Sequence, residues 1–188
     1  MSQPATFVYA RLNARLRPLD RAELYGDPLQ EALEKSGVGE VTGGGTMQAQ
    51  SSEIQYCGID VDAYDLDRAV PLICGLLEQM GAPRGSRLEF EQDGVQREVA
   101  FGKLEGLAIY LNGTELKPEV YAESDVNHVW SEIERLMEGV GSIQSYWEGP
   151  AETALYLYGD SVNAMRERIA GFMDTYPLCE RARYEVIA

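Results

Sequence analysis

Histidine and cysteine are scarce in this sequence, which has one histidine, His128, and three cysteines, Cys57, Cys74 and Cys179. A histidine-based zinc site or a Ser-His-Asp triad would depend on that single imidazole, so neither is expected. The cysteines are odd in number and form no CxxC pair, which favours buried, reduced thiols. We therefore predict no metal ligands, no cofactor and no catalytic residues. An enzyme that uses Asp and Glu as acid and base is the minor alternative, because carboxylates are abundant but no pair stands out.

Long apolar runs are also missing. No stretch of about 18 apolar residues exists, so no membrane-spanning helix is predicted. The first residues, MSQPATFVYARLN, show no basic segment followed by an apolar core. We therefore expect a cytoplasmic protein without membrane contact.

Basic residues are outnumbered. The 16 Lys and Arg residues face 31 Asp and Glu residues, which gives a formal net charge of −15. Such a field repels nucleic acid, so nucleic-acid binding is disfavoured. High net charge is typical of a soluble protein, and it also suits rapid association with a basic protein partner.

The first half of the chain predicts the order β-α-β-β-α-β. The alternation in TFVYARLNARLR predicts a strand over residues 6–16. Asp27 followed by Pro28 predicts the start of a helix, and Gly37 its end. The segments GEVTGGGTMQ and EIQYCGIDVDAYD, joined by AQSS, form a predicted hairpin.

The remaining elements of this half follow the same logic. A helix is predicted from a capping aspartate, Asp65 or Asp67, to Gly81. The segment SRLEFEQDGVQREVAF then returns as strand around the tight turn QDG.

The second half repeats this order. Strands are predicted around the NG turn of KLEGLAIYLNGTELK. An amphipathic helix, a hairpin around Gly149, a second helix and a closing strand, RARYEVIA, follow. The segment GEVTGGGTMQ corresponds to GSIQSYWEGP, which indicates a repeated pattern of low identity. We predict an α+β fold of two tandem ferredoxin-like (βαββαβ) repeats, residues 1–102 and 103–188, with antiparallel sheets and helices on one face.

Three consecutive glycines, Gly43, Gly44 and Gly45, interrupt the first hairpin. A P-loop is excluded because no Lys-Ser/Thr pair and no helix follow them, and the spacing also fails the dinucleotide fingerprint. Glycines inside a strand favour a bulge, a bend or the close approach of another group. We expect a large residue such as Tyr56 or Trp147 to cover them. A protein contact surface and a small-ligand site made by exposed amides are the alternatives.

Two charged clusters flank this region. The stretch IDVDAYDLD lacks the glycine and glutamate of a calcium loop. Asp60 and Asp62 share one strand face, so a solvated face is expected, with an acidic docking patch of Asp60, Asp62 and Asp65 as the functional alternative. Among the arginines of ARLNARLRPLDR, Arg11 and Arg15 are candidates to bind an anion together with the glycines; internal salt bridges are the simpler interpretation.

Aromatic residues gather in the second hairpin, where Tyr146 and Trp147 lie on one strand and Tyr156 and Tyr158 on the other. Such residues usually pack a core. Outward-facing ones serve as interface anchors, so Tyr146 and Trp147 are candidate partner-binding residues.

The stretches LNARLRPLDR, DPL, GEVTGGGT and EIQYCGI resemble a family of uncharacterised bacterial cytoplasmic proteins over roughly the first half of the chain. In type, though not in motif, such small acidic proteins are similar to immunity proteins, which protect a cell from its own antibacterial toxins. The resemblance implies a non-catalytic protein that occludes the active site of a basic toxin enzyme. The alternative is a regulatory module that senses a nucleotide or other small molecule between the repeats. A homodimer is compatible with either function.

Overall fold

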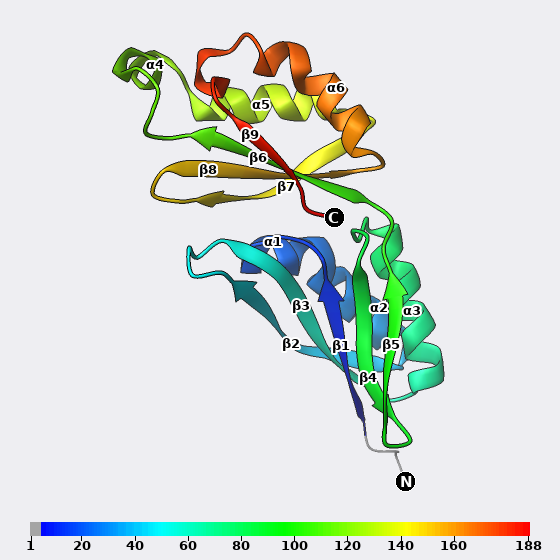
Figure 1. The fold of residues 1–188 in the computed structure, drawn as a ribbon. Coiled ribbons are helices and arrows are strands. Elements are labelled where there is room, and N and C mark those ends of the chain that lie inside the picture. Colours follow the sequence, from blue (N-terminus) through cyan, green and yellow to red (C-terminus); the bar gives the residue numbers. More distant parts are fainter. Residues whose placement is uncertain (1–4) are drawn as a thin grey trace. The chain divides into compact units, whose positions relative to one another are not determined.

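The computed structural model describes residues 5–188 and divides the chain into two compact units (Figure 1). The first unit runs to Ala49 and resumes at Ile54–Lys103; the second consists of Gln50–Glu53 and Leu104–Ala188. Each unit is an α+β, ferredoxin-like repeat with an antiparallel sheet, so the predicted fold class is confirmed. None of the helices in residues 5–188 is long and apolar enough to cross a membrane.

The first unit has a five-stranded sheet in the order β2-β3-β1-β4-β5. Its helices α2 and α3 lie on one face of the sheet (Figure 1). The element bounds are β1 Thr6–Leu12, α1 Pro18–Arg21, the π-helical η1 Ala22–Gly26, α2 Asp27–Ser36, β2 Gly39–Gln48, β3 Ile54–Ala63, α3 Leu66–Gln79, β4 Ser86–Gln92 and β5 Val95–Phe101. The strands β1 to β4 make the ferredoxin-like sheet, and β5 extends it at the β4 edge.

The central strand β1 alternates strictly between the two faces of this sheet. Its side chains Val8, Ala10 and Leu12 are fully buried on the helix side, while Phe7 is 54% exposed. The strand is shorter than the predicted 6–16, because Asn13 leaves the ladder. Its backbone N–H donates to Ser86 Oγ at 3.0 Å, and its side-chain amide donates to the Arg84 carbonyl at 2.7 Å.

The first helix starts earlier than predicted. Asp27 does not cap it, because Pro18 opens a helical run that continues through η1 into α2. The π-helical turn lies where Tyr25 is fully buried. The predicted end is confirmed: Gly37 adopts φ 63°, the left-handed conformation that glycine tolerates.

The second unit has a four-stranded sheet in the order β7-β8-β6-β9, with α5 and α6 on one face (Figure 1). This is the order of the first four strands in the other unit. The bounds are β6 Glu105–Asn112, α4 Pro118–Glu123, α5 Val126–Met137, β7 Gly141–Glu148, β8 Glu152–Gly159, α6 Val162–Met173, the 3₁₀ turn η2 Pro177–Cys179 and β9 Arg183–Val186. Its core joins Leu107, Ile109, Val129, Ile133, Leu157 and Met165, among others.

The second strand predicted around the NG turn is absent from this unit. Strand β6 ends at Asn112, whose side-chain Oδ1 accepts hydrogen bonds from the backbone N–H groups of Thr114 and Glu115 at 3.0 and 2.8 Å. An asparagine side chain that bonds the backbone ahead of it replaces the strand ladder with a turn. The chain therefore enters α4 instead of a hairpin.

The strands β2 and β7 share an irregularity at the same place. The register shifts between Val41 and Gly43 in β2, and between Ile143 and Ser145 in β7. Both shifts follow the third residue of a strand that opens with glycine. A bulge at the same position in both repeats supports the correspondence of GEVTGGGTMQ with GSIQSYWEGP.

The three thiols lie in environments that suppress ionisation. Burial raises the pKa of Cys57 to about 12, against a smaller opposing effect of the Arg21 charge. Burial also raises the pKa of Cys74 and of Cys179 to about 11. All three cysteines are free, and no disulfide links them within residues 5–188.

We predict slow alkylation of the native protein. At pH 8 a pKa of about 12 leaves Cys57 with a thiolate fraction about a thousandfold below that of a thiol with pKa 9.0. Peptide mass spectrometry after iodoacetamide treatment should find Cys57 modified last, and all three cysteines modified together in urea. Rapid modification of native Cys57 would contradict its burial.

Candidate functional site

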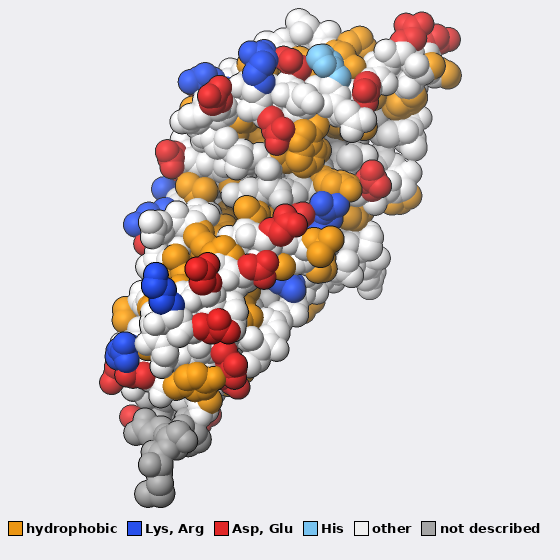
Figure 2. Space-filling model, turned by 180° about the vertical axis from the view of Figure 1, so that it is seen from behind, with side chains coloured by type: hydrophobic (Ala, Val, Ile, Leu, Met, Phe, Trp, Pro, Cys, Tyr) orange, Lys and Arg blue, Asp and Glu red, His pale blue; other side chains and the backbone are white. Residues whose placement is uncertain are grey.

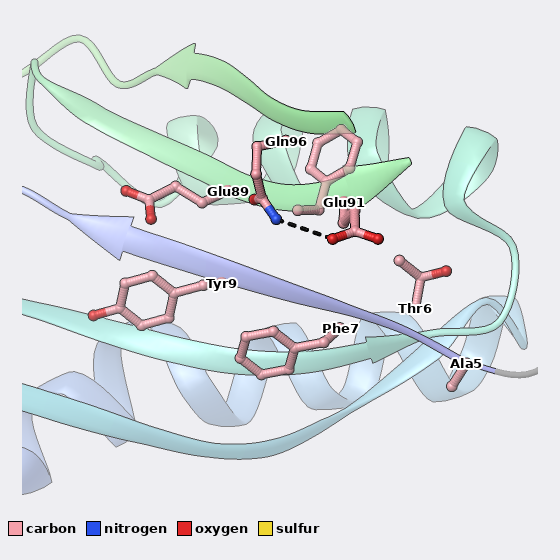
Figure 3. Close-up of a pocket in the computed structure, with 8 residues that line it drawn as sticks. Ala5, Thr6, Phe7, Tyr9, Glu89, Glu91 and Gln96 are labelled. Carbon is pink, nitrogen blue, oxygen red and sulfur yellow. Dashed lines mark hydrogen bonds between the residues drawn. The ribbon is translucent and has the colours of Figure 1, made fainter. Parts of the chain in front are cut away.

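The face of the first sheet that carries no helix is the most prominent candidate surface. Strand alternation places Phe7, Tyr9 and Arg11 of β1 on it, opposite the buried residues of the same strand. The register pairs Tyr9 with Asp60 and with Glu89, and Phe7 with Asp62. Because paired residues share a face, aromatic and acidic side chains alternate across three strands. Figure 3 shows Phe7 and Tyr9 extending from β1 beside Glu89 and Glu91 of β4.

Two predicted partner-binding residues, Asp60 and Asp62, therefore share this open face. Asp65 does not, because it is the N-cap of α3. Its carboxylate accepts a hydrogen bond from the Arg68 N–H at 3.2 Å and lies 3.8 Å from the Arg68 guanidinium. The role of Asp65 is to begin a helix.

The arginines of this face occupy the adjacent cross-strand row. Arg11 pairs with Arg87 across β1 and β4. The Arg11 guanidinium lies 3.8 Å from the centroid of the Tyr56 ring, and Arg87 Nε lies 2.6 Å from Glu89 and 3.2 Å from Glu98. Both cations therefore have partners on the face itself, and Arg87 compensates the charge of Glu89 and Glu98, whereas no ion pair with Asp60 or Asp62 is found within the described part of this unit.

Negative charge is not confined to this face. Figure 2 shows Asp and Glu side chains scattered over the side of the molecule opposite to the view of Figure 1, with Lys and Arg side chains between them. Charge alone thus selects no surface. The open face of the first sheet adds to its carboxylates the ring of Phe7, which is the most exposed aromatic side chain among the described residues.

The glycine triplet lies on the edge strand β2, and an arginine covers it. The Arg21 guanidinium donates to the Gly45 carbonyl at 2.9 Å and to Thr46 Oγ1 at 3.0 Å. A Cβ at Gly44 would lie 2.6 Å from the Gly58 carbonyl and 3.2 Å from Arg21 Nε. The expected cover by Tyr56 or Trp147 is therefore wrong, and the glycine is explained by the close approach of the Gly58 carbonyl and, beyond it, of Arg21.

A hollow of about 270 Å³ lies beside the triplet, between the first helical run and β2. Its lining includes Arg21, Asp27, Gln30, Gly43 and Ile59. The predicted arginines are not among its lining residues. Arg11 belongs to the cross-strand row of Gly58 and Gly45 on the open face, and Arg15 is half-buried between β1 and α1.

The two predicted aromatic anchors lie in the second unit. Tyr146 packs against the core, with its ring edge-on to Trp130 at 6.0 Å. The Trp147 indole N–H donates to Ser52 Oγ at 3.3 Å, and its ring fills the space where a side chain at Gly149 would lie. Tyr146 and Trp147 belong to the second unit, whereas Asp60 and Asp62 belong to the first.

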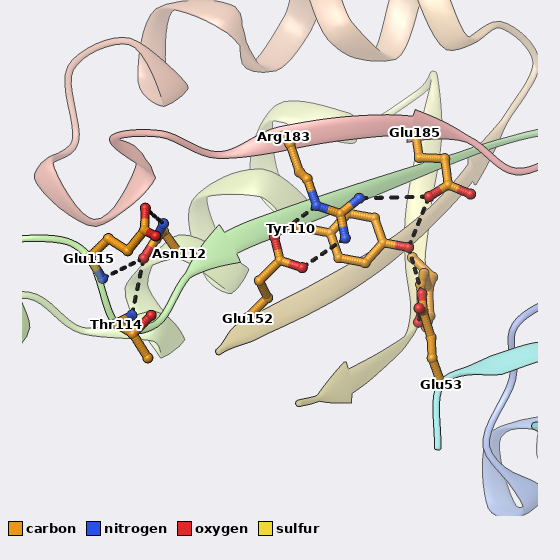
Figure 4. Close-up of polar contacts among 9 residues, drawn as sticks. Glu53, Tyr110, Asn112, Thr114, Glu115, Glu152, Arg183 and Glu185 are labelled. Carbon is orange, nitrogen blue, oxygen red and sulfur yellow. Dashed lines mark hydrogen bonds and ion pairs between the residues drawn. The ribbon is translucent and has the colours of Figure 1, made fainter. Parts of the chain in front are cut away.

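A polar cluster in the second unit was not predicted. The Glu53 carboxylate accepts hydrogen bonds from the hydroxyls of Tyr110 at 2.5 Å and Tyr156 at 3.0 Å (Figure 4). The Arg183 guanidinium lies 3.5 Å from the Tyr110 ring centroid and forms a bidentate ion pair with the Glu152 carboxylate. The two Glu53 hydrogen bonds anchor residues 50–53 in the second unit. A single glutamate after AQSS does not predict them.

No family model matches the chain, and no curated protein matches it. Solved structures of similar architecture include the regulatory subunit of aspartate kinase from Thermus flavus, at 10% identity over 90% of this chain and 93% of that one, with a TM-score of 0.28. A candidate monooxygenase from Fusobacterium nucleatum is 10% identical over 100% and 94%, with a TM-score of 0.33. A heme-binding protein from Thermus thermophilus is 12% identical over 97% and 88%, with a TM-score of 0.31. Similarities this low do not transfer a function.

Substitution of single glycines tests the explanation of the triplet. We expect Gly44→Ala to lower the free energy of unfolding by about 1–3 kcal/mol, because the methyl group would overlap the Gly58 carbonyl. Gly45→Ala is the matched control: apart from its own and its chain neighbours' atoms, nothing lies within 4 Å of the position that its Cβ would take, so a change within about 0.5 kcal/mol is expected. Urea denaturation followed by circular dichroism measures both. Equal losses would show that backbone conformation, not close approach, requires glycine.

The Glu53 cluster predicts a stability effect in the second unit. Glu53→Ala removes an acceptor shared by two buried tyrosine hydroxyls, and we expect a loss of about 1–3 kcal/mol. Glu115→Ala is the control, since it removes an exposed ion pair with Arg181 at 3.5 Å, worth about 0–1 kcal/mol. Both tryptophans lie in this unit, so fluorescence reports its unfolding. A Glu53→Ala variant with the wild-type free energy of unfolding would show that the cluster does not contribute to stability.

Proposed function

We propose that the chain is a non-catalytic protein-binding protein that neutralises a basic enzyme, as an immunity protein neutralises its cognate antibacterial toxin. The open face of the first sheet carries the proposal, because Asp60 and Asp62 lie there beside the exposed ring of Phe7. Carboxylates speed the encounter with a basic protein, and aromatic side chains supply buried contact once it is bound. Occlusion of a basic active-site cleft needs no chemistry from this chain.

The net charge supports a protein partner over other macromolecules. A charge of −15 repels phosphate backbones and anionic lipid headgroups alike. The same charge attracts the basic clefts of enzymes that act on nucleotides or nucleic acids, which are common among antibacterial toxins.

The environments of the usual catalytic residues support a role without catalysis. The His128 ring packs against Tyr176 at 5.0 Å and Phe172 at 5.8 Å, which gives it a place in an aromatic cluster. The thiols have a raised pKa and are poor nucleophiles at neutral pH.

A small-molecule sensor is the second candidate, and the hollow beside Gly43 favours it. The Arg21 guanidinium there would attract an anionic ligand, and Ile59 and Val41 give the hollow an apolar part. A thermal-shift screen separates the two functions: stabilisation by a nucleotide or amino acid supports the sensor, and stabilisation only by a protein supports the neutralising function.

Capture from extracts of the native host should retrieve a basic enzyme, and association with it provides a quantitative prediction. We expect the double variant Asp60→Asn/Asp62→Asn to bind that enzyme more slowly, by about tenfold at low salt, with a flatter salt dependence. Its folding should be nearly unchanged, because neither carboxylate caps a helix. Stopped-flow association at low and high salt measures this.

The control for this experiment is Glu119→Gln/Glu123→Gln on α4, which removes the same charge from exposed positions in the other unit. If both double variants slow association equally, net charge alone is responsible and the open face is not the contact. Capture of housekeeping proteins only would overturn the proposed function.

A further inference from the structure

A hollow of about 690 Å³ lies on the open face of the first sheet, at the start of β1 beside β4 and β5. The side chains that matter here are Phe7 and Tyr9 from β1, Glu89 and Glu91 from β4, and Gln96 from β5 (Figure 3). Its volume lies within the range of about 300–1,000 Å³ that is usual for ligand sites. The hollow therefore has room for side chains of a partner.

The aromatic side of the hollow is exposed because of the strand pattern. Phe7 lies between Thr6 and the fully buried Val8, so its ring must point away from the core. The Tyr9 ring lies over Gly58, where a Cβ would be 2.2 Å from the tyrosine hydroxyl, and is held there. Phe7 is thus a half-exposed ring next to a fixed one, an arrangement typical of a contact surface.

The charges around these two rings are acidic. Asp62 pairs with Phe7, Asp60 with Tyr9, and Glu89 with Tyr9 from the other side. Glu91 accepts a hydrogen bond from the Gln96 amide at 3.3 Å. Burial is the main cause that raises the pKa of the Tyr9 hydroxyl, and Asp60 adds to it, so the phenol stays neutral.

The arginines of β1, β4 and β5 have other partners or lie on the other face. Arg87 bonds Glu89 and Glu98, and Arg11 stacks on Tyr56 in the next row. Arg97 of β5 pairs with Phe90, a residue of the core side, so it extends from the opposite face to Gln96. The carboxylates of Glu91 and Asp62 therefore have no ion pair within the first unit as described in residues 5–103.

We propose that this hollow receives an arginine side chain of the basic partner, with the guanidinium over the Phe7 ring and in contact with the Glu91 carboxylate. A planar, weakly hydrated guanidinium stacks on an aromatic face and bonds a carboxylate at the same time, whereas an ammonium does so less well. This inference rests on the proposed function and names the contact through which it acts.

The test uses the full chain and a fluorescein-labelled hexa-arginine peptide, with fluorescence anisotropy at low salt. We expect saturable binding, weakened about tenfold by Phe7→Ala and by Glu91→Gln, and unchanged by Glu119→Gln/Glu123→Gln. Hexa-lysine should bind at least several-fold more weakly, because it lacks the stacking contribution. Circular dichroism establishes that each variant is folded.

Three results would overturn the inference. The first is equal affinity of the Phe7→Ala and wild-type proteins for hexa-arginine, and the second is equal affinity of the wild-type protein for hexa-arginine and hexa-lysine. The third is displacement of the labelled peptide by free spermine as effective as displacement by unlabelled hexa-arginine. Its failure is distinguishable from failure of the proposed function. A folded Phe7→Ala/Glu91→Gln variant that still binds the captured enzyme with wild-type affinity refutes the arginine site alone. A wild-type chain that captures no basic protein refutes the function itself.

Discussion

Everything in the first unit depends on the two-residue alternation of β1. Three side chains of this strand, Val8, Ala10 and Leu12, are buried between the sheet and the helices. Their burial fixes the orientation of the strand and so places Phe7, Tyr9 and Arg11 on the opposite face. A shift of β1 by one residue in its pairing would exchange the buried and the outward-facing side chains, and the apolar side chains that are now in the core would become exposed to solvent. The core thus holds the candidate contact surface in register.

The sequence predicted features that have a local cause. Gly37 ends a helix because only a left-handed residue fits there, and Asp65 begins one because its carboxylate bonds the first turn. The prediction at Asn112 was wrong for a reason that is also local. An NG pair is typical of a hairpin turn, yet the Asn112 side chain accepts hydrogen bonds from the backbone N–H groups of Thr114 and Glu115. The sequence is compatible both with a hairpin turn and with an asparagine side chain that bonds the backbone ahead of it. The alternation of the flanking residues does not distinguish these two structures.

Features that depend on the pairing register of strands distant in sequence could not be predicted from the sequence. The alternation of β3 placed Asp60 and Asp62 on one face, but their pairing with Tyr9 and Phe7 is a property of the folded sheet. The same holds for Glu53, which meets Tyr110 and Tyr156 across more than fifty residues of chain. Aromatic residues were ranked as anchors by type, so Tyr146 was selected although it packs a core, and Phe7 was overlooked.

The glycine triplet is best understood by comparison of the two repeats. The shared bulge aligns Gly44 of β2 with Tyr146 of β7; each faces the helix side and pairs with an apolar residue, Ile59 or Leu155. In the second repeat the tyrosine ring itself packs against α5. In the first repeat, the helical run that opens at Pro18 brings Arg21 over the strand instead. A side chain at position 44 would meet both the Gly58 carbonyl and the Arg21 guanidinium, so the space that Tyr146 fills in the second repeat is taken by an arginine from the helical run in the first.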